Sequence, residues 1–144
     1  MRVLYREIKR KNVEFIDRVI NIEELIGQKA EADLSLGAFG PSERIRWSLT
    51  NKAFETIAMA RPLLTAGTRE TVAVRSFFTD KETCFFAPLA DAKGLARTIL
   101  WVRNHDSVRQ RVAEKGYALF QQLCSKELQE ARVREVVARV YGNW

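Results

Sequence analysis

Residues that build metal, disulfide and nucleophile sites are scarce in this sequence, which has two cysteines and one histidine among its 144 residues. Cys84 and Cys124 have no metal-ligand spacing and indicate no disulfide framework. Cys84 lies in an apolar run that favours a buried, reduced thiol. His105 stands in a polar stretch typical of a turn between two helices. We therefore expect no metal site and no bound cofactor.

Glycine and proline are also few, at seven and three residues, which excludes collagen-like and low-complexity chains. No apolar run reaches the roughly 20 residues that a membrane-spanning helix needs. Residues 1–15 lack the apolar core and small-residue cleavage site of a signal peptide. Because neither signal is present, we expect a cytoplasmic protein. Its length fits one domain. Its 47% hydrophobic and 29% charged residues are typical of a folded globular chain.

Acidic residues are outnumbered, with 18 Asp and Glu against 24 Lys and Arg, so the formal net charge is +6. A basic protein favours anionic partners such as nucleotides, nucleic acid or an anionic membrane surface. Nucleic acid is a poor candidate, because aromatic residues do not alternate with the basic ones and no base-reading motif is present. Peripheral contact with the inner membrane surface stays open, since a helix predicted over residues 1–10 places apolar residues beside the basic block Arg6, Lys9, Arg10 and Lys11.

Short apolar runs alternate with helical periods along the chain, which predicts an α/β fold around a Rossmann-like parallel sheet. We expect about four strands, flanking helices and a helical C-terminal region. The predicted strands are 13–16, 33–39, 62–66 and 83–87. The predicted helices are 22–32, 51–60, 68–77, 91–103, 106–123 and 125–141, with a polar loop over 42–49.

The apolar runs 63–66 and 84–87 are nearly continuous, as in strands that helices cover on both faces. Asn21, with Glu24 three residues later, predicts a capping box at the start of helix 22–32, and Thr50 can cap helix 51–60. Ligands of parallel α/β sheets bind beyond the carboxyl ends of the strands. The candidate binding loops are therefore 17–21, 40–49, 66–68 and 88–90.

Dinucleotide-binding, P-loop and nucleophile-elbow motifs are absent from the sequence. What remains is the start of helix 51–60, where Asn51 and Lys52 stand at a helix N-terminus, a favourable place for phosphate. Glu55 leans back toward that N-terminus, and its carboxylate can accept hydrogen bonds from two neighbouring sugar hydroxyls. The alternative interpretation is that Glu55 only complements the helix dipole.

Several stretches carry a more specific order of residues than periodicity requires. They are Asn12-Val13-Glu14-Phe15, then Ala32-Asp33-Leu34-Ser35-Leu36, then NKAFETIAMARPLLT over 51–65, and TDKETCFFAP over 79–88. In this order and spacing they resemble the C-terminal, nucleotide-sugar-binding domain of the group 1 retaining glycosyltransferases, which are two-domain enzymes of GT-B fold. The resemblance covers residues 12–123.

The resemblance implies roles for several residues. Glu55 matches the second glutamate of the family's E-x7-E motif, which binds the ribose hydroxyls of the nucleotide. Gly40, Pro41 and Ser42 match a loop that approaches the donor sugar and phosphates. Thr65, Gly67 and Thr68 match a turn beside the ligand. The implied substrate is a nucleoside-diphosphate sugar, transferred with retention to an acceptor.

The sequence also departs from the family pattern. Trp47 stands where the first glutamate of E-x7-E would fall, and Glu43 in the same loop is the candidate to replace it as a catalytic residue. Ala60 stands where a glycine is usual. The family's phosphate-binding Arg and Lys and its N-terminal acceptor domain are absent. We expect residues 1–144 to be a truncated donor-binding domain, either a fragment or a degenerate stand-alone domain, without transferase activity alone.

A non-enzymatic interaction module is the alternative function. The C-terminal region carries apolar residues at helical spacing, namely Val108, Val112, Leu119, Leu123, Leu128, Val133, Val136, Val137 and Val140. Such a stripe is usually core, but without the acceptor domain part of it can be exposed and drive self-association.

Overall fold

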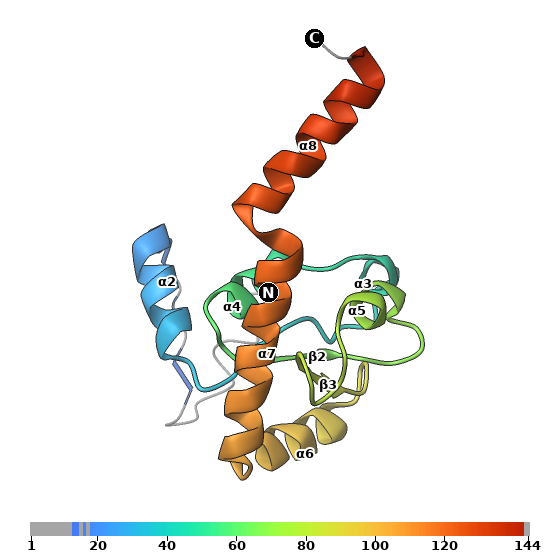
Figure 1. The fold of residues 1–144 in the computed structure, drawn as a ribbon. Coiled ribbons are helices and arrows are strands. Elements are labelled where there is room, and N and C mark those ends of the chain that lie inside the picture. The colour runs from blue at the N-terminus through green and yellow to red at the C-terminus, as the bar shows by residue number, and fades with distance from the viewer. Residues whose placement is uncertain (1–12, 15, 17, 143–144) are drawn as a thin grey trace.

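A parallel sheet with helices on both of its faces forms the centre of the chain (Figure 1). The computed structural model describes residues 13, 14, 16 and 18–142. The described sheet has three strands in the order β1-β2-β3, which are β1 (Ser35–Leu36), β2 (Leu63–Ala66) and β3 (Phe85–Ala87). The helices are α2 (Ile22–Glu31), α3 (Glu43–Trp47), α4 (Asn51–Ala58), α5 (Val72–Phe77), α6 (Ala92–Arg103), α7 (Asp106–Cys124) and α8 (Lys126–Tyr141). The predicted α/β fold with a parallel sheet is confirmed.

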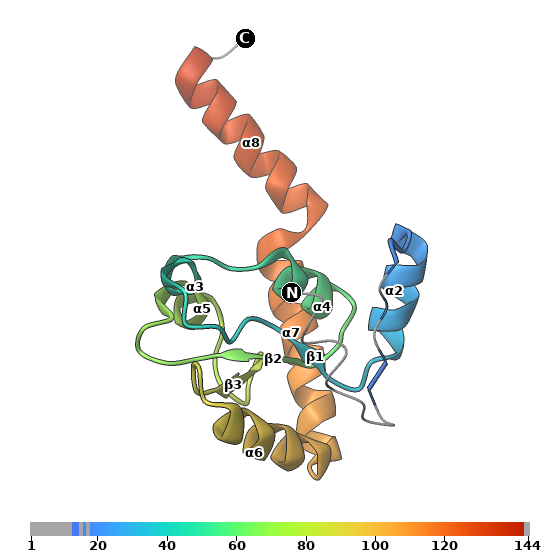
Figure 2. The same ribbon diagram turned by 180° about the vertical axis from the view of Figure 1, so that it is seen from behind.

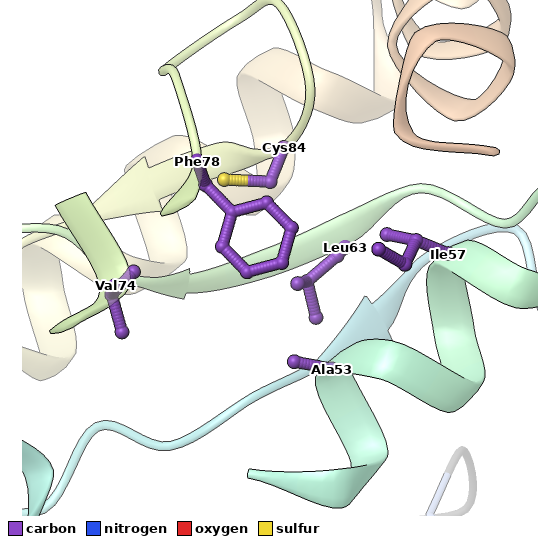
Figure 3. Close-up of a cluster of buried hydrophobic side chains, with 6 residues drawn as sticks. All are labelled: Ala53, Ile57, Leu63, Val74, Phe78 and Cys84. Carbon is purple, nitrogen blue, oxygen red and sulfur yellow. The ribbon is translucent and has the colours of Figure 1, made fainter. Parts of the chain in front are cut away.

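Two hydrophobic clusters hold the sheet, one on each face. Side chains alternate across β2, so Leu63 belongs to one cluster and Leu64 to the other. Figure 3 shows the first cluster, in which α4 and α5 cover the sheet, with members Ala53, Ile57, Leu63, Val74, Phe78 and Cys84. The second cluster joins the sheet to α6 and α7, with members Leu64, Phe85, Ala87, Val102 and Val112. The expectation that both faces are covered is therefore confirmed.

Cys84 is fully buried in the first cluster. Burial raises the pKa of its thiol, and the carboxylate of Asp80 raises it further. The predicted buried, reduced thiol is confirmed. His105 lies between α6 and α7, as the prediction of an inter-helix turn requires.

Close backbone approaches need glycine at two places. A Cβ on Gly116 of α7 would lie 2.9 Å from the carbonyl oxygen of Thr83 and 3.2 Å from Ile57 Cγ2, so Gly116 lets α7 pack directly on α4. A Cβ on Gly67 would lie 1.9 Å from the Phe86 ring. The loop after β2 therefore stays close to β3 only because residue 67 has no side chain.

The predicted strand 13–16 is wrong where it is described, because Val13, Glu14 and Ile16 lie outside any strand. Val13 and Ile16 are about 40% exposed (42% and 40%), so this short run buries too little apolar surface to hold a strand. The predicted helix 1–10, and with it the basic segment proposed to contact membranes, lies outside the described residues. The part of the chain that is described has no helix with the length and apolarity to cross a bilayer.

Residues 42–49 are not entirely a loop, because they contain α3. Ser42 takes the N-cap position without a side-chain capping hydrogen bond, and Glu43 in the first turn complements the helix dipole, which favours a helix even though the segment is polar. The predicted strand 33–39 shortens to β1, although its pairing continues through the Gly37 N–H, which donates to the Leu64 carbonyl at 2.8 Å.

The helix predicted over 68–77 starts late, at Val72. Thr71 Oγ1 accepts from the Thr68 N–H at 3.0 Å and donates to the Thr68 carbonyl at 2.9 Å. This local turn competes with the helix and delays its start.

Candidate functional site

The carboxyl edge of the sheet gathers three segments that follow the strands. The Gly40–Ser42 segment and α3 follow β1, Gly67 and Thr68 follow β2, and Pro88 follows β3. α3 and α5 lie side by side at this edge (Figures 1 and 2). The candidate binding loops after these strands therefore belong to one end of the sheet, where ligands of such folds bind.

The first hollow at this edge surrounds the N-terminus of α4 and has a volume of about 490 Å³. Its lining residues are Arg44, Ile45, Ser48, Leu49, Thr50, Asn51 and Lys52, which include two cations and no carboxylate. Thr50 occupies the N-cap position as predicted, but its side chain accepts no capping hydrogen bond, so that part of the prediction is wrong. Positive charge and an uncapped helix start make this hollow suitable for an anion.

Glu55 lies one turn beyond Asn51 and Lys52 on the same helix. Its side chain is 46% exposed, and Lys29 of α2 donates from Nζ to Glu55 Oε2. The described partner of this carboxylate is therefore an ammonium group of another helix rather than the N-terminus of its own helix. Oε1 accepts no hydrogen bond from the described residues, so it is available to a ligand.

The second hollow lies beside α3 and has a volume of about 200 Å³. Its lining residues are Pro41, Ser42, Glu43, Arg46, Glu70 and Leu89. Gly40 is exposed, with no atom within 4 Å of a Cβ built on it, so its backbone can be approached closely. Glu43 stands one turn before Trp47 on α3, in a hollow separate from that of Asn51 and Lys52.

The third hollow lies between the ends of β2 and β3 and has a volume of about 640 Å³. Its lining residues are Gly67, Thr68, Arg75, Phe78, Thr79, Asp80, Phe86, Ala87 and Pro88. The Gly67 N–H donates to the Ala87 carbonyl at 3.0 Å and the Thr68 N–H to Thr71 Oγ1, so both amides are already used within the protein. Thr65 is buried in β2 against Gly37, below the edge rather than on it.

Each hollow contains one arginine, namely Arg44, Arg46 and Arg75, and none of these forms a salt bridge with the described residues. Arg44, Arg46 and Arg75 are not among the residues that the sequence predicted to bind a ligand. The sequence feature that could have identified these arginines is their position in segments that follow predicted strands. The edge is thus lined with cations that are free to meet an anionic ligand.

The described residues contain no cluster of three or more His, Cys, Asp or Glu side chains that could hold a metal ion. The donors at the carboxyl edge are instead guanidinium, ammonium, hydroxyl and amide groups. This chemistry suits a phosphate or a polyhydroxylated ligand.

Comparison with solved structures identifies a fold shared with part of a glycosyltransferase of GT-B type. The chain is similar to sucrose-phosphate synthase from Thermosynechococcus elongatus, with a TM-score of 0.70 and 16% sequence identity over 85% of this chain. It spans 29% of the length of that protein. No family model and no curated protein sequence matches the chain. At this identity the similarity establishes the fold, and a role for individual residues has to be argued from the site itself.

Proposed function

We propose that this chain is a donor-binding domain of a glycosyltransferase, which holds a nucleoside-diphosphate sugar for transfer to an acceptor with retention. The observation that carries the proposal is the arrangement on α4. An uncapped, cation-lined helix start and an exposed carboxylate lie one turn apart on the same helix. Asn51 and Glu55 are separated by about 6 Å along the helix axis, a distance that one nucleotide can span.

In this proposal the diphosphate binds at the start of α4. Arg44, Lys52 and the backbone N–H groups of Asn51 and Lys52 complement its charge. The same groups stabilise the negative charge that develops on the nucleoside diphosphate as it leaves the sugar. The ribose hydroxyls donate to Glu55, and the donor sugar extends toward Gly40, Pro41, Ser42 and Glu43.

Catalysis needs a second domain that carries the acceptor and closes over the donor. Closure would exclude water and complete the catalytic site. The domain described here supplies grip and orientation, which lower the entropic part of the barrier. We therefore expect donor binding without sugar transfer by this chain alone. Glu43 is proposed as the catalytic carboxylate that replaces the glutamate expected at Trp47.

The test is a titration of the isotope-labelled chain with UDP, GDP and ADP, followed by backbone amide NMR. We expect saturable shifts at Asn51, Lys52 and Glu55 and at the Gly40–Ser42 loop, with one base preferred. Glu55→Ala should weaken binding, whereas Glu114→Ala, an exposed glutamate of α7, should not. Absence of shifts at this edge with millimolar nucleotide would contradict the proposal.

A protein-interaction module is the second candidate function, and α8 is the observation that favours it. This helix buries none of its residues, and Val133, Val136, Val137 and Val140 are 45–66% exposed. α8 extends from the end of α7 away from the sheet in both views (Figures 1 and 2). Sedimentation of the chain over a range of concentrations tests whether this face drives self-association.

A further inference from the structure

A contact between α2 and α4 involves Glu55 itself. Lys29 stands in the last turn of α2 and donates from Nζ to Glu55 Oε2, across 26 positions of the chain. Figures 1 and 2 show α2 beside the sheet on the side of α4. The helix thus reaches the carboxylate that the proposed function assigns to the ribose.

The two partners differ in their exposure to solvent. The Lys29 side chain is 21% exposed, against 46% for Glu55. At the start of α2, Asn21 Oδ1 accepts from the Glu24 N–H at 2.8 Å, and Arg18 pairs with the Glu24 carboxylate. The ion pair thus joins a better covered lysine side chain to a more exposed carboxylate, and it restrains the position of that carboxylate.

This pairing leaves ligand-binding capacity on the carboxylate. Lys29 engages one oxygen, and Oε1 accepts no hydrogen bond from the described residues. A carboxylate has about four lone-pair sites, so two adjacent hydroxyls can still donate to Glu55 while Lys29 remains bound. An exposed glutamate without such a partner samples several rotamers, and losing them on binding reduces affinity. Lys29 removes that freedom before the ligand arrives.

We infer that Lys29 is a positioning residue for Glu55 and sets the selectivity of the site for nucleotides that carry both ribose hydroxyls. This inference rests on the proposed function, in which Glu55 receives the ribose. Lys29 acts through Glu55 and makes no contact with the reacting atoms.

The experiment compares the nucleoside diphosphate that binds most tightly among UDP, GDP and ADP with its 2′-deoxy counterpart. Affinities are measured by NMR titration for the wild type, Lys29→Met, Glu55→Gln and the double variant. Lys29→Met should lower the preference for the ribonucleotide about fivefold, because a hydrogen bond to a charged group is weakened. In the Glu55→Gln background, Lys29→Met should change the preference no further. Lys29→Arg should retain most of it.

Lys115→Met is the matched control. It removes another lysine–glutamate pair, formed with Glu82 at 2.8 Å, that does not involve α2 or α4. Its preference for the ribonucleotide should equal that of the wild type. If Lys29→Met weakens both nucleotides equally or changes neither, the inference is wrong while the proposed function stands. If the wild type binds no nucleotide, the proposed function and this inference both fail.

Discussion

α7 and α8 are consecutive helices of similar length, yet they have opposite environments. α7 (19 residues) buries Val112, Ala113 and Gly116, whereas α8 (16 residues) buries none. Both carry valines at helical spacing. In α7, Gly116 lets the helix approach Ile57 and Thr83 directly. An apolar period therefore predicts which face of a helix can be buried, while burial itself depends on a partner close enough to cover it.

The largest expected effect on the free energy of unfolding comes from a cavity made in the core. Ile57 belongs to α4 and is fully buried against the sheet and α7. Ile57→Ala should lower the free energy of unfolding by about 3 kcal/mol, from lost burial and a residual cavity. Val133→Ala in α8 should change it by less than about 0.5 kcal/mol. Urea denaturation measures both, and equal losses would show that α8 is packed as firmly as the core.

The sheet could be predicted from the sequence because its signals are local. The apolar runs that became β2 and β3 are bounded by turns, and Asn21 with Glu24 marks the start of α2. The capping box is only half formed, since the Glu24 side chain pairs with Arg18 instead of returning to Asn21. The pair of Lys29 and Glu55 had no local signal, because only the tertiary fold brings residues 26 positions apart together.

The candidate site was predictable as a set of loops but not as a single pocket. The order of strands places the segments after β1, β2 and β3 at one edge, as expected. The structure then divides their residues among three hollows and buries Thr65 below the edge. That division depends on α3 and on the packing of α3 against α5. The polar sequence of 42–49 predicts a loop rather than this helix.

Cys84 gives the stability of the core a dependence on pH. Burial, with a contribution from Asp80, raises the pKa of its thiol, so the folded chain keeps the proton above the ordinary thiol pKa of about 8.5. From about pH 8.5 to pH 10 the unfolded chain therefore binds fewer protons, and the free energy of unfolding should fall from this group, with a slope that approaches about 1.4 kcal/mol per pH unit.

Comparison with Cys84→Ala isolates that effect. Urea denaturation of both proteins at several pH values cancels the titration of lysines and tyrosines that they share. The stability difference between wild type and variant should shrink as the pH rises. A constant difference would show that the Cys84 thiol ionises in the folded chain as readily as in the unfolded one.

A smaller effect is expected at Ala60, where α4 turns into β2. Its φ of 51° lies in the left-handed region, where a Cβ is unfavourable and glycine is favoured. Ala60→Gly should raise the free energy of unfolding by about 1 kcal/mol. Ala58→Gly, two residues earlier in the last turn of α4, should lower it by about the same amount. A loss of stability in both variants would contradict the strain at Ala60.

The smallest effect on stability is expected from a substitution in α8. That substitution should instead have a large effect on self-association. Val137 is 45% exposed and contributes little to the folded chain, so Val137→Asp should change the free energy of unfolding by less than about 0.5 kcal/mol. If the valine face pairs with a second copy, a charge at its centre would be desolvated there and should abolish the pairing. Sedimentation equilibrium measures this, with Ala131→Asp, on the opposite side of the helix, as the control. If the wild-type chain remains monomeric at high concentration, the exposed valines of α8 do not drive self-association. Another partner would then be needed to cover them.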